Sequence, residues 1–463
     1  MGTLTRTTRA IIGLFTSPGP NQPSIPSISP QHSLEEYLNR SYKNVKAAGK
    51  LGPDLGLKTC VPISIFLKSK SGPPIYAGNS DTIGAQLHHL DEEECYSASL
   101  IKVAAMFAAF KLRAEAKALI NDIQAGTVIS TTQLDFFNKL KAKFNLGDAV
   151  TDISSVAGNA KGPSYGDILS VTGFPTPSAL VANFSSDFRT HLRKMIIPSD
   201  NCSAGECTVR LSFPYINVKL MEDGFYDKTS KKGIWLCGDY IQSFCPPATV
   251  AKKQKYVTID TINDCNQATP PFCGSAQNTT SKQMASFFYQ IMMRTLVDPL
   301  SSDDMHKLLR EAQHGSNSVV PPETIPPVWP AADGAGDTSF LTRTAEVTIP
   351  LHFSVDAVKI GQGPIKTDTS RMPSPCGGTG QLPCTEVRSE GILIKWNKIT
   401  SGQADFDADL KKKFDDLNLT GDAAICWQNL PNQLPSGSAL SPDGVVQIIN
   451  TCIDDYVSQA PLP

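Results

Sequence analysis

The sequence lacks a large net charge of either sign, and it lacks any long uncharged apolar run. Its 463 residues carry 42 Lys and Arg against 44 Asp and Glu, which gives a formal net charge of −2. A nucleic-acid binder needs clustered basic side chains to neutralise phosphates, so this balance argues against that class. Spanning a bilayer takes about 18–20 apolar residues, and even the run 104–110 is bounded by Lys102 and Lys111. We therefore predict no nucleic-acid partner and no membrane span.

Histidine is scarce, and several common catalytic motifs are missing. The chain has only seven His, and none of them shows the spacing of metal ligands. It has no G-x-S-x-G nucleophile elbow, no H-E-x-x-H zinc motif and no phosphate-binding P-loop. The sequence therefore predicts neither a metal site nor a cofactor.

Cysteine, by contrast, is abundant, and its twelve copies have informative spacings. Thiols used this heavily favour an oxidising compartment over a cytosolic protein with buried reduced thiols. We therefore expect an extracellular or periplasmic location, although no export signal is evident at the N-terminus. Four cysteines, Cys60, Cys95, Cys426 and Cys452, have no close neighbour in sequence. The other eight lie in close pairs that suit short-loop disulfides: Cys202 with Cys207, Cys237 with Cys245, Cys265 with Cys273, and Cys376 with Cys384.

The order of predicted elements indicates a single α/β (α+β) domain. Residues 1–32 end in a Pro- and Ser-rich run, which we expect to be disordered. Within 33–463, sheet segments at 58–80 and 346–463 flank a helical region at about 99–345. This order predicts an antiparallel sheet flanked by helices, completed from both ends of the chain and interrupted by an inserted all-helical subdomain. The periodicity predicts helices over 33–50, 99–118, 131–144, 186–197, 281–297, 302–313 and 445–457, and strands over 61–68, 75–78, 346–359 and 387–396.

Ser99 and Lys102 stand where a predicted helix begins, and this helix is apolar almost all round. Residues three apart share a helix face, so the Lys102 amine is expected beside the Ser99 hydroxyl. A serine hydroxyl is a weak nucleophile until a base takes its proton, and a lysine can be that base when burial lowers its pKa. The pattern alone also fits a helix cap followed by a lysine that reaches solvent.

Two further motifs give this pair a chemical context. Ser-Asp-Asn at 199–201 is by itself a polar turn, but Ser199 could shuttle a proton, and Asn201 could hold the lysine and a substrate carbonyl. Lys-Ile-Gly at 359–361 ends a strand-like run. Lys359 could attract a substrate carboxylate there, and the glycine would let a ligand approach the strand.

The three motifs in this order resemble those of the class A β-lactamase-like, penicillin-recognising serine hydrolases. The resemblance covers roughly 58–400 and includes the opening strand pair at 63–80 and the Thr-Thr-x-x-x-Met-Ala-like segment at 278–285. It implies an oxyanion hole formed by backbone N–H groups of Ser99 and Gln362, which follows Gly361. It further implies that Ser99 is the acylated nucleophile, Lys102 its general base, Ser199 the proton shuttle, Asn201 the substrate-orienting amide and Lys359 the electrostatic anchor.

The chain departs from this family at two points. Ile360 stands where the family has Thr or Ser, so a hydroxyl that would bind the substrate carboxylate is missing. The Glu-x-x-Leu-Asn segment that supplies the deacylating base of class A β-lactamases does not occur between Cys202 and Thr280. Asp239 is a candidate substitute, and an acid in such a loop is more often simply solvated. Without that base, a β-lactam is expected to acylate Ser99 and remain attached.

The sequence therefore predicts a serine hydrolase that uses a Ser-Lys acyl-enzyme mechanism on an amide or ester, with a small-molecule or peptide-like substrate. One alternative is a true β-lactamase with an unrelated deacylating group. Another is a catalytically weak or inactive binding protein that retains the cleft, which Ile360 and the missing glutamate favour. The sequence does not indicate the oligomeric state or the natural substrate.

Overall fold

The structure is a computed structural model of the whole chain. The residues that it describes are 32–52, 60–143, 162–227, 230, 232–236, 277–314, 337–366, 384–402, 404–432 and 438–459. The segment predicted to be disordered, 1–32, lies outside them except for its last residue, His32.

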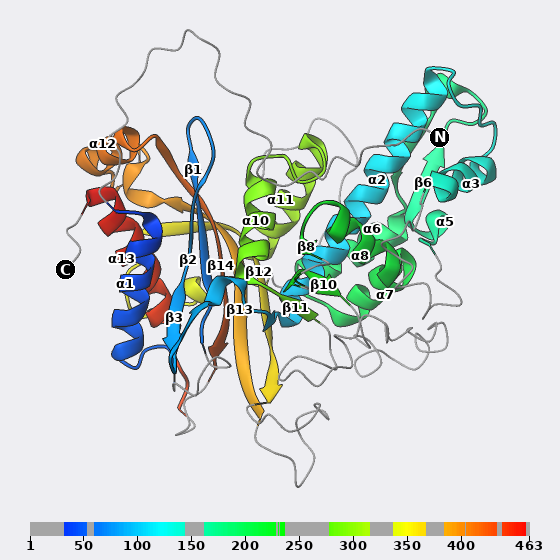
Figure 1. Cartoon of the computed structure of the whole chain (residues 1–463). Helices are drawn as coiled ribbons and strands as arrows, with labels where there is room; N and C mark the ends of the chain where they lie inside the picture. The colour runs from blue at the N-terminus through cyan, green and yellow to red at the C-terminus, as the bar shows by residue number, and fades with distance from the viewer. Residues whose placement is uncertain are drawn as a thin grey trace, which may run out of the picture.

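A five-stranded antiparallel sheet joins strands from both ends of the chain (Figure 1). Its spatial order is β12-β13-β14-β1-β2, so the last strand in sequence lies beside the first. This arrangement confirms the predicted fold class, in which the sheet is completed around an insertion. The strands are β1 (Ile63–Ser69), β2 (Ile75–Gly78), β12 (Phe353–Lys366), β13 (Cys384–Trp396) and β14 (Leu419–Pro431).

Helices pack on both faces of this sheet. On one face lie α1 (Leu34–Ala47) and α13 (Asp443–Ser458), which pack against each other. On the other face lie α10 (Ser281–Met292) and α11 (Pro299–His314), with α10 against β14 and β1 and α11 against β12. Burial on both faces makes the central strand β14 almost continuously buried from its middle to its end.

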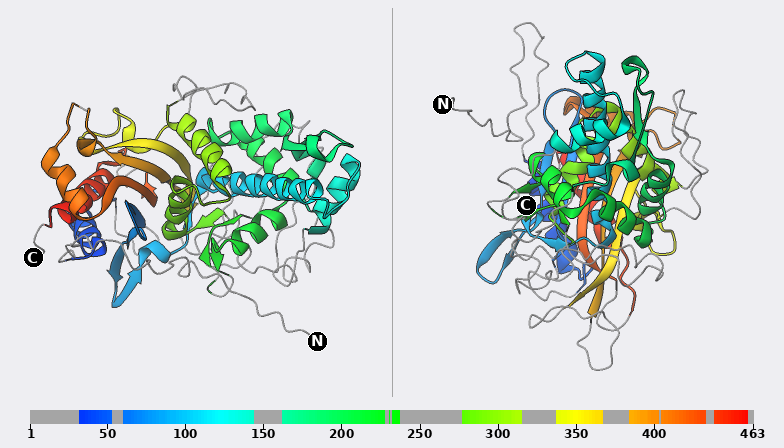
Figure 2. Two further views of the ribbon diagram at one scale, coloured as in Figure 1. Left: turned by 90° about the horizontal axis from the view of Figure 1, so that it is seen from above. Right: turned by 90° about the vertical axis from the view of Figure 1, so that its right-hand side faces the viewer.

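The region inserted between the sheet segments is built around α2 (Lys102–Gln124). Figure 2 shows α2 running lengthwise between helices on either side. Its rings make edge-to-face contacts in the core, Phe107 with Phe225 and Phe110 with Phe184. Around it lie α3 (Gln133–Lys143), α5 (Tyr165–Ile168), α6 (Ser186–Ile196), α7 (Asn201–Leu211), α8 (Phe213–Glu222), and the short strands β5 (Cys95–Tyr96), β6 (Leu169–Thr172), β7 (Val181–Phe184), β8 (Tyr226–Asp227), β9 (Lys232–Gly233), β10 (Trp235–Leu236) and β11 (Gln277–Thr279).

The seven predicted helices and four predicted strands are all present, with shifted ends. The first helix begins with a capping box, in which the Glu36 amide donates to Ser33 Oγ at 3.2 Å. Several elements were not predicted. Outside the insertion they are β5, the hairpin of β3 (Ser80–Ile83) with β4 (Gln86–His89), the helix α12 (Ala408–Asp416), and β14. The insertion was predicted to be all-helical, but besides the unpredicted helices α5, α7 and α8 it contains the short strands β6 to β11. The β14 sequence contains Gly, Asp, Asn and Pro, which are depleted in strands, so its pairing with two neighbours overrides local preference.

The predicted Cys202–Cys207 disulfide is wrong. Cys207 is a buried thiol on α7 that forms no disulfide, whereas Cys202 is disulfide-bonded, so the two are not bonded to each other. Cys60, Cys95, Cys426 and Cys452 are also buried and form no disulfide. A helix holds positions five apart on different faces, and Cys207 points into the core. The other three predicted pairs include residues outside the described ranges, and the expected location in an oxidising compartment stays a prediction.

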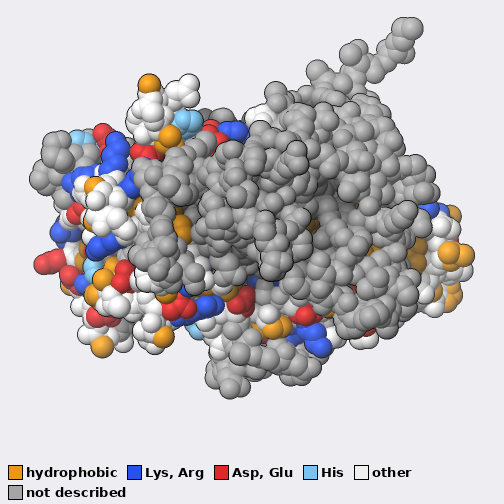
Figure 3. Space-filling model, turned by 90° about the horizontal axis from the view of Figure 1, so that it is seen from below, with side chains coloured by type: hydrophobic (Ala, Val, Ile, Leu, Met, Phe, Trp, Pro, Cys, Tyr) orange, Lys and Arg blue, Asp and Glu red, His pale blue; other side chains and the backbone are white. Residues whose placement is uncertain are grey.

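The described surface does not concentrate one sign of charge on the face drawn in Figure 3, where basic and acidic side chains are interspersed. Among the described residues, no helix combines the length and the apolar composition needed to cross a bilayer.

Candidate active site

Ser99 lies in a tight turn that leads into the buried helix. The turn is the 3-10 helix η4 (Ala98–Ile101), and α2 follows it directly. Leu100 N donates to Ser97 O at 3.0 Å, which closes the turn. Ala98, just before the serine, has φ = 46°, a left-handed conformation that is strained for a residue with a side chain. The turn leaves Ser99 only partly buried, three residues before the first residue of α2.

Lys102 is the first residue of α2, and its side chain is buried at 2% exposure. Its Nζ donates to Asn201 Oδ1 at 2.7 Å and to the Ser199 carbonyl oxygen, and it lies 3.1 Å from Ser199 Oγ. Burial holds the pKa of Lys102 well below the usual lysine value, and the nearby Lys359 charge lowers it further. The structure thus supplies the desolvation that a lysine base requires.

Ser199, Asp200 and Asn201 form the turn between α6 and α7. The Asp200 side chain caps α7, since its Oδ1 accepts the Ser203 amide at 2.7 Å. Ser199 has φ = 57°, a second left-handed residue in the site. The cap fixes where α7 begins, so it also fixes Asn201 at the first turn, facing the Lys102 amine.

Lys359 reaches the same hydroxyl from the sheet. It lies on β12 with a side chain that is 0% exposed, and its Nζ donates to Ser199 Oγ at 2.6 Å. Burial lowers the pKa of Lys359, while the carboxylate of Asp337 opposes that shift. Ser199 Oγ therefore lies between two lysine amines that come from different parts of the fold.

Gly361 lets the sheet and the turn that contains Ser99 pack closely together. A Cβ at this position would lie 2.1 Å from Ser97 O and 2.8 Å from Leu100 N, so only glycine lets β12 pack this closely on η4. The glycine was predicted to admit a ligand, and the structure gives it this packing role with the backbone of the turn. Gln362 follows at the exposed surface, paired in register with Arg388 of β13.

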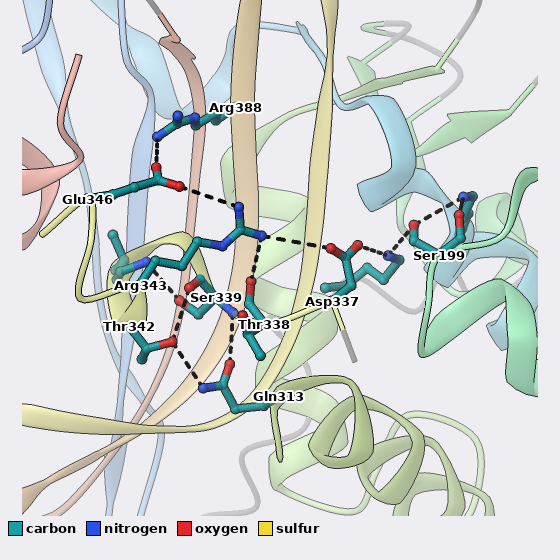
Figure 4. A network of polar contacts seen from close by, with 12 residues as sticks. Ser199, Gln313, Asp337, Thr338, Ser339, Thr342, Arg343, Glu346 and Arg388 are labelled. Carbon is teal, nitrogen blue, oxygen red and sulfur yellow. Dashed lines mark hydrogen bonds and ion pairs between the residues drawn. The ribbon is translucent and has the colours of Figure 1, made fainter. Parts of the chain in front are cut away.

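Sequence reasoning missed Asp337. Its Oδ2 lies 3.4 Å from Lys359 Nζ, and its amide donates to the Ile197 carbonyl at 3.0 Å, just beyond α6. Figure 4 shows Asp337 between Ser199 and Arg343, where a polar network leads on to Glu346 and Arg388. No motif surrounds Asp337 in the sequence, and only the tertiary fold brings it to the lysine.

The structure thus brings Lys102, Ser199, Asn201 and Lys359 into one hydrogen-bonded cluster beside the Ser99 turn. Ile360 packs into the core on the α1 and α13 side of the sheet at 5% exposure. The candidate Asp239 lies outside the described residues. Within the described ranges, no group of three His, Cys, Asp or Glu side chains could hold a metal ion.

Searches against protein-family models and against curated proteins found no match. Solved structures similar to this chain are class A β-lactamases and a penicillin-binding protein. A β-lactamase from Xanthomonas campestris has 13% identity and a TM-score of 0.36, with 92% of this chain and 99% of that chain covered. A class A β-lactamase from Bacteroides cellulosilyticus has 9% identity and a TM-score of 0.39, with 92% of this chain and 100% of that chain covered. A PBP-A mutant in an acyl-enzyme complex with penicillin G has 11% identity and a TM-score of 0.37, with 92% of this chain and 100% of that chain covered.

Proposed function

We propose that this chain is a serine hydrolase that forms an acyl-enzyme on Ser99 with an amide or ester substrate. The observation that supports this most directly is the pair of lysine amines on Ser199 Oγ, at 3.1 Å from Lys102 and 2.6 Å from Lys359. Such a cluster beside a serine in a strained turn can take a proton from the nucleophile and return one to a leaving group.

Lys102 has the surroundings of a general base. A neutral amine has two N–H groups and one lone pair. The Ser199 carbonyl and Asn201 Oδ1 can accept the two N–H groups, which leaves the lone pair for a hydroxyl proton. Burial favours this neutral form over the ammonium ion.

In the proposed acylation, Ser99 Oγ attacks the carbonyl carbon and its proton passes to Lys102. The carbon–nitrogen or carbon–oxygen bond then breaks, and the leaving atom takes the proton of the Ser199 hydroxyl, which Lys102 replaces. Backbone N–H groups of Ser99 and Gln362 would bind the oxyanion. Water then adds to the ester on Ser99 and releases a carboxylic acid, which restores the free serine.

Intact-mass spectrometry tests this proposal with two reagents, a fluorescent penicillin and an uncharged fluorophosphonate. The fluorophosphonate reports an activated serine, because Ser Oγ displaces fluoride from phosphorus. We expect a single adduct on Ser99, absent in Ser99→Ala and unchanged in the control Ser170→Ala, which alters an exposed serine on β6.

The outcomes separate the alternatives. A lasting penicillin adduct corresponds to penicillin-binding behaviour, and rapid loss of the adduct with product release corresponds to a β-lactamase. If neither reagent modifies Ser99 in the folded wild-type protein, the hydrolase proposal is wrong and a non-catalytic cleft is what remains.

A further inference from the structure

The charge of Lys359 is already matched inside the protein. The Asp337 carboxylate lies 3.4 Å from the Lys359 amine, and the lysine side chain is 0% exposed whereas that of Asp337 is 23% exposed. A ligand that approaches from solvent therefore has more access to the carboxylate than to the ammonium group. Because opposite charges this close cancel much of each other's field, Lys359 offers little attraction for an anion.

The neighbouring arginines are paired as well. Arg343 lies 3.9 Å from Asp337 Oδ1 and 3.7 Å from Glu346 Oε1, and Arg388 lies 2.6 Å from Glu346 Oε2. Both guanidinium groups lie over the Phe340 ring, at 4.4 and 5.1 Å. In Figure 4, Asp337 stands between these arginines and Ser199. Their positive charge is thus held within the network on the far side of Asp337.

The residue after Lys359 adds no polar group to the site. Ile360 is buried in an apolar cluster, and its partner across the strands is Glu390 of β13. Glu390 is fully buried, and this burial raises its pKa to about 8. At this position β12 and β13 therefore carry the hydrocarbon side chain of Ile360 and the carboxyl group of Glu390. Neither is a hydroxyl or a cation that could bind a carboxylate.

Burial lowers the pKa of Lys102, which disfavours a lasting positive charge on its amine. The Lys359 amine on Ser199 Oγ lies 3.4 Å from the Asp337 carboxylate, so these two opposite charges balance each other beside Ser199. We infer that the substrate is an ester or amide with no carboxylate beside its scissile bond, and that Asp337 is the residue that discriminates against such a carboxylate. This inference rests on the proposed acyl-enzyme function of Ser99.

A penicillin and its methyl ester test this directly, since the two share the reacting carbonyl and differ only in the charge of the carboxyl group. We expect the methyl ester to acylate wild-type Ser99 at least about tenfold faster than the free acid, measured by intact mass over time. Asp337→Asn keeps the shape and removes the charge, so it should raise the free-acid rate relative to the ester rate by about tenfold. Asp303→Asn, an acid on α11 paired with Arg294, is the control and should leave the ratio unchanged.

The two proposals fail in different ways. Equal acylation of the wild type by free acid and ester, with the same ratio in Asp337→Asn, would overturn the inference and leave the hydrolase intact. Absence of any Ser99 adduct with both penicillins and with the uncharged fluorophosphonate would overturn the hydrolase itself. A thermal melt verifies that Asp337→Asn is folded. If the variant does not fold, the comparison of free acid with methyl ester on the wild type alone decides the inference.

Discussion

At the scale of single residues, two buried lysines on one serine hydroxyl are the central feature of the site. Each lysine alone would be costly to bury, because the interior disfavours an ammonium ion. The Lys359 amine lies 3.4 Å from the Asp337 carboxylate, and the Lys102 amine donates to the neutral oxygen atoms of Ser199 and Asn201. In the proposed mechanism, Lys359 carries the charge and Lys102 is the base.

The assignment predicts a pH effect of changing Lys359. The Lys359 cation disfavours a second proton nearby and so lowers the pKa of Lys102. Replacing the cation by a neutral side chain in Lys359→Met raises that pKa, so more alkaline pH is needed to free the base. We expect the rate of Ser99 modification by the fluorophosphonate to reach half its plateau at higher pH than in the wild type, with a lower plateau because the hydrogen bond to Ser199 is lost.

The control for this measurement is Lys395→Met, which removes an exposed lysine from β13. We expect Lys395→Met to leave unchanged the pH at which the modification rate reaches half of its plateau. A profile of Lys359→Met that moves toward acid pH would contradict the assignment of Lys102 as the base.

At the scale of elements, the site depends on how closely β12 approaches η4. The contact is made by Gly361, whose absent side chain leaves room for the backbone at Ser97 and Leu100. Neither atom belongs to a flexible side chain that could turn aside. The spacing between the strand and the turn therefore sets the distance from Lys359 to the nucleophile.

Gly361→Ala tests this contact. The added methyl group would lie 2.1 Å from Ser97 O, so β12 and η4 must separate. Because small displacements of reacting groups are costly, we expect modification of Ser99 by the fluorophosphonate to slow about 100-fold, with the far-UV circular dichroism unchanged. Gly166→Ala is the matched control, since a Cβ there meets only Phe137, at 3.5 Å. Wild-type rates in Gly361→Ala would show that the close contact is not needed.

Much of this element-level arrangement could be predicted, because it is encoded locally. The Ser33–Glu36 capping box and the apolar run of α2 follow from short patterns, and the three motifs identified the residues that meet around Ser199. Asp337 could not be predicted, because its role depends on a contact with a strand residue that only the folded chain brings near. The strand β14 was missed for the same reason: its pairing partners lie far away in sequence.

At the scale of the whole molecule, a carboxyl group is enclosed between the sheet and the network behind the site. Glu390 is 0% exposed, and its pKa is raised from 4.5 to about 8, mainly by burial. The folded protein therefore binds this proton more tightly than the unfolded chain does. Between about pH 4.5 and about 8 the unfolded chain has lost the proton while the folded protein retains it, so stability falls as the pH rises.

The substitution Glu390→Gln tests how much Glu390 contributes to the pH dependence of the unfolding free energy. Glutamine matches the protonated carboxyl in shape and cannot ionise. The wild type should lose up to ~1.4 kcal/mol of unfolding free energy per pH unit across this window from Glu390 alone, and the variant should lack that slope. Urea unfolding at several pH values measures it, with Glu35→Gln on exposed α1 surface as the control. Parallel pH profiles of wild type and Glu390→Gln would contradict the protonated state.

The position of β1 has a consequence for the order of events during biosynthesis. This strand lies between β2, which follows it at once, and β14, where Ile63 pairs with Trp427 near the end of the chain. A two-stranded hairpin is at best marginally stable in water, so β1 and β2 must wait for β14. While the ribosome is still translating the middle of the chain, the sheet that carries Lys359 is incomplete. Alignment of Lys359 with Ser199 therefore follows the synthesis of β14, and ribosome-bound nascent chains that stop before β14 should be inert toward active-site reagents.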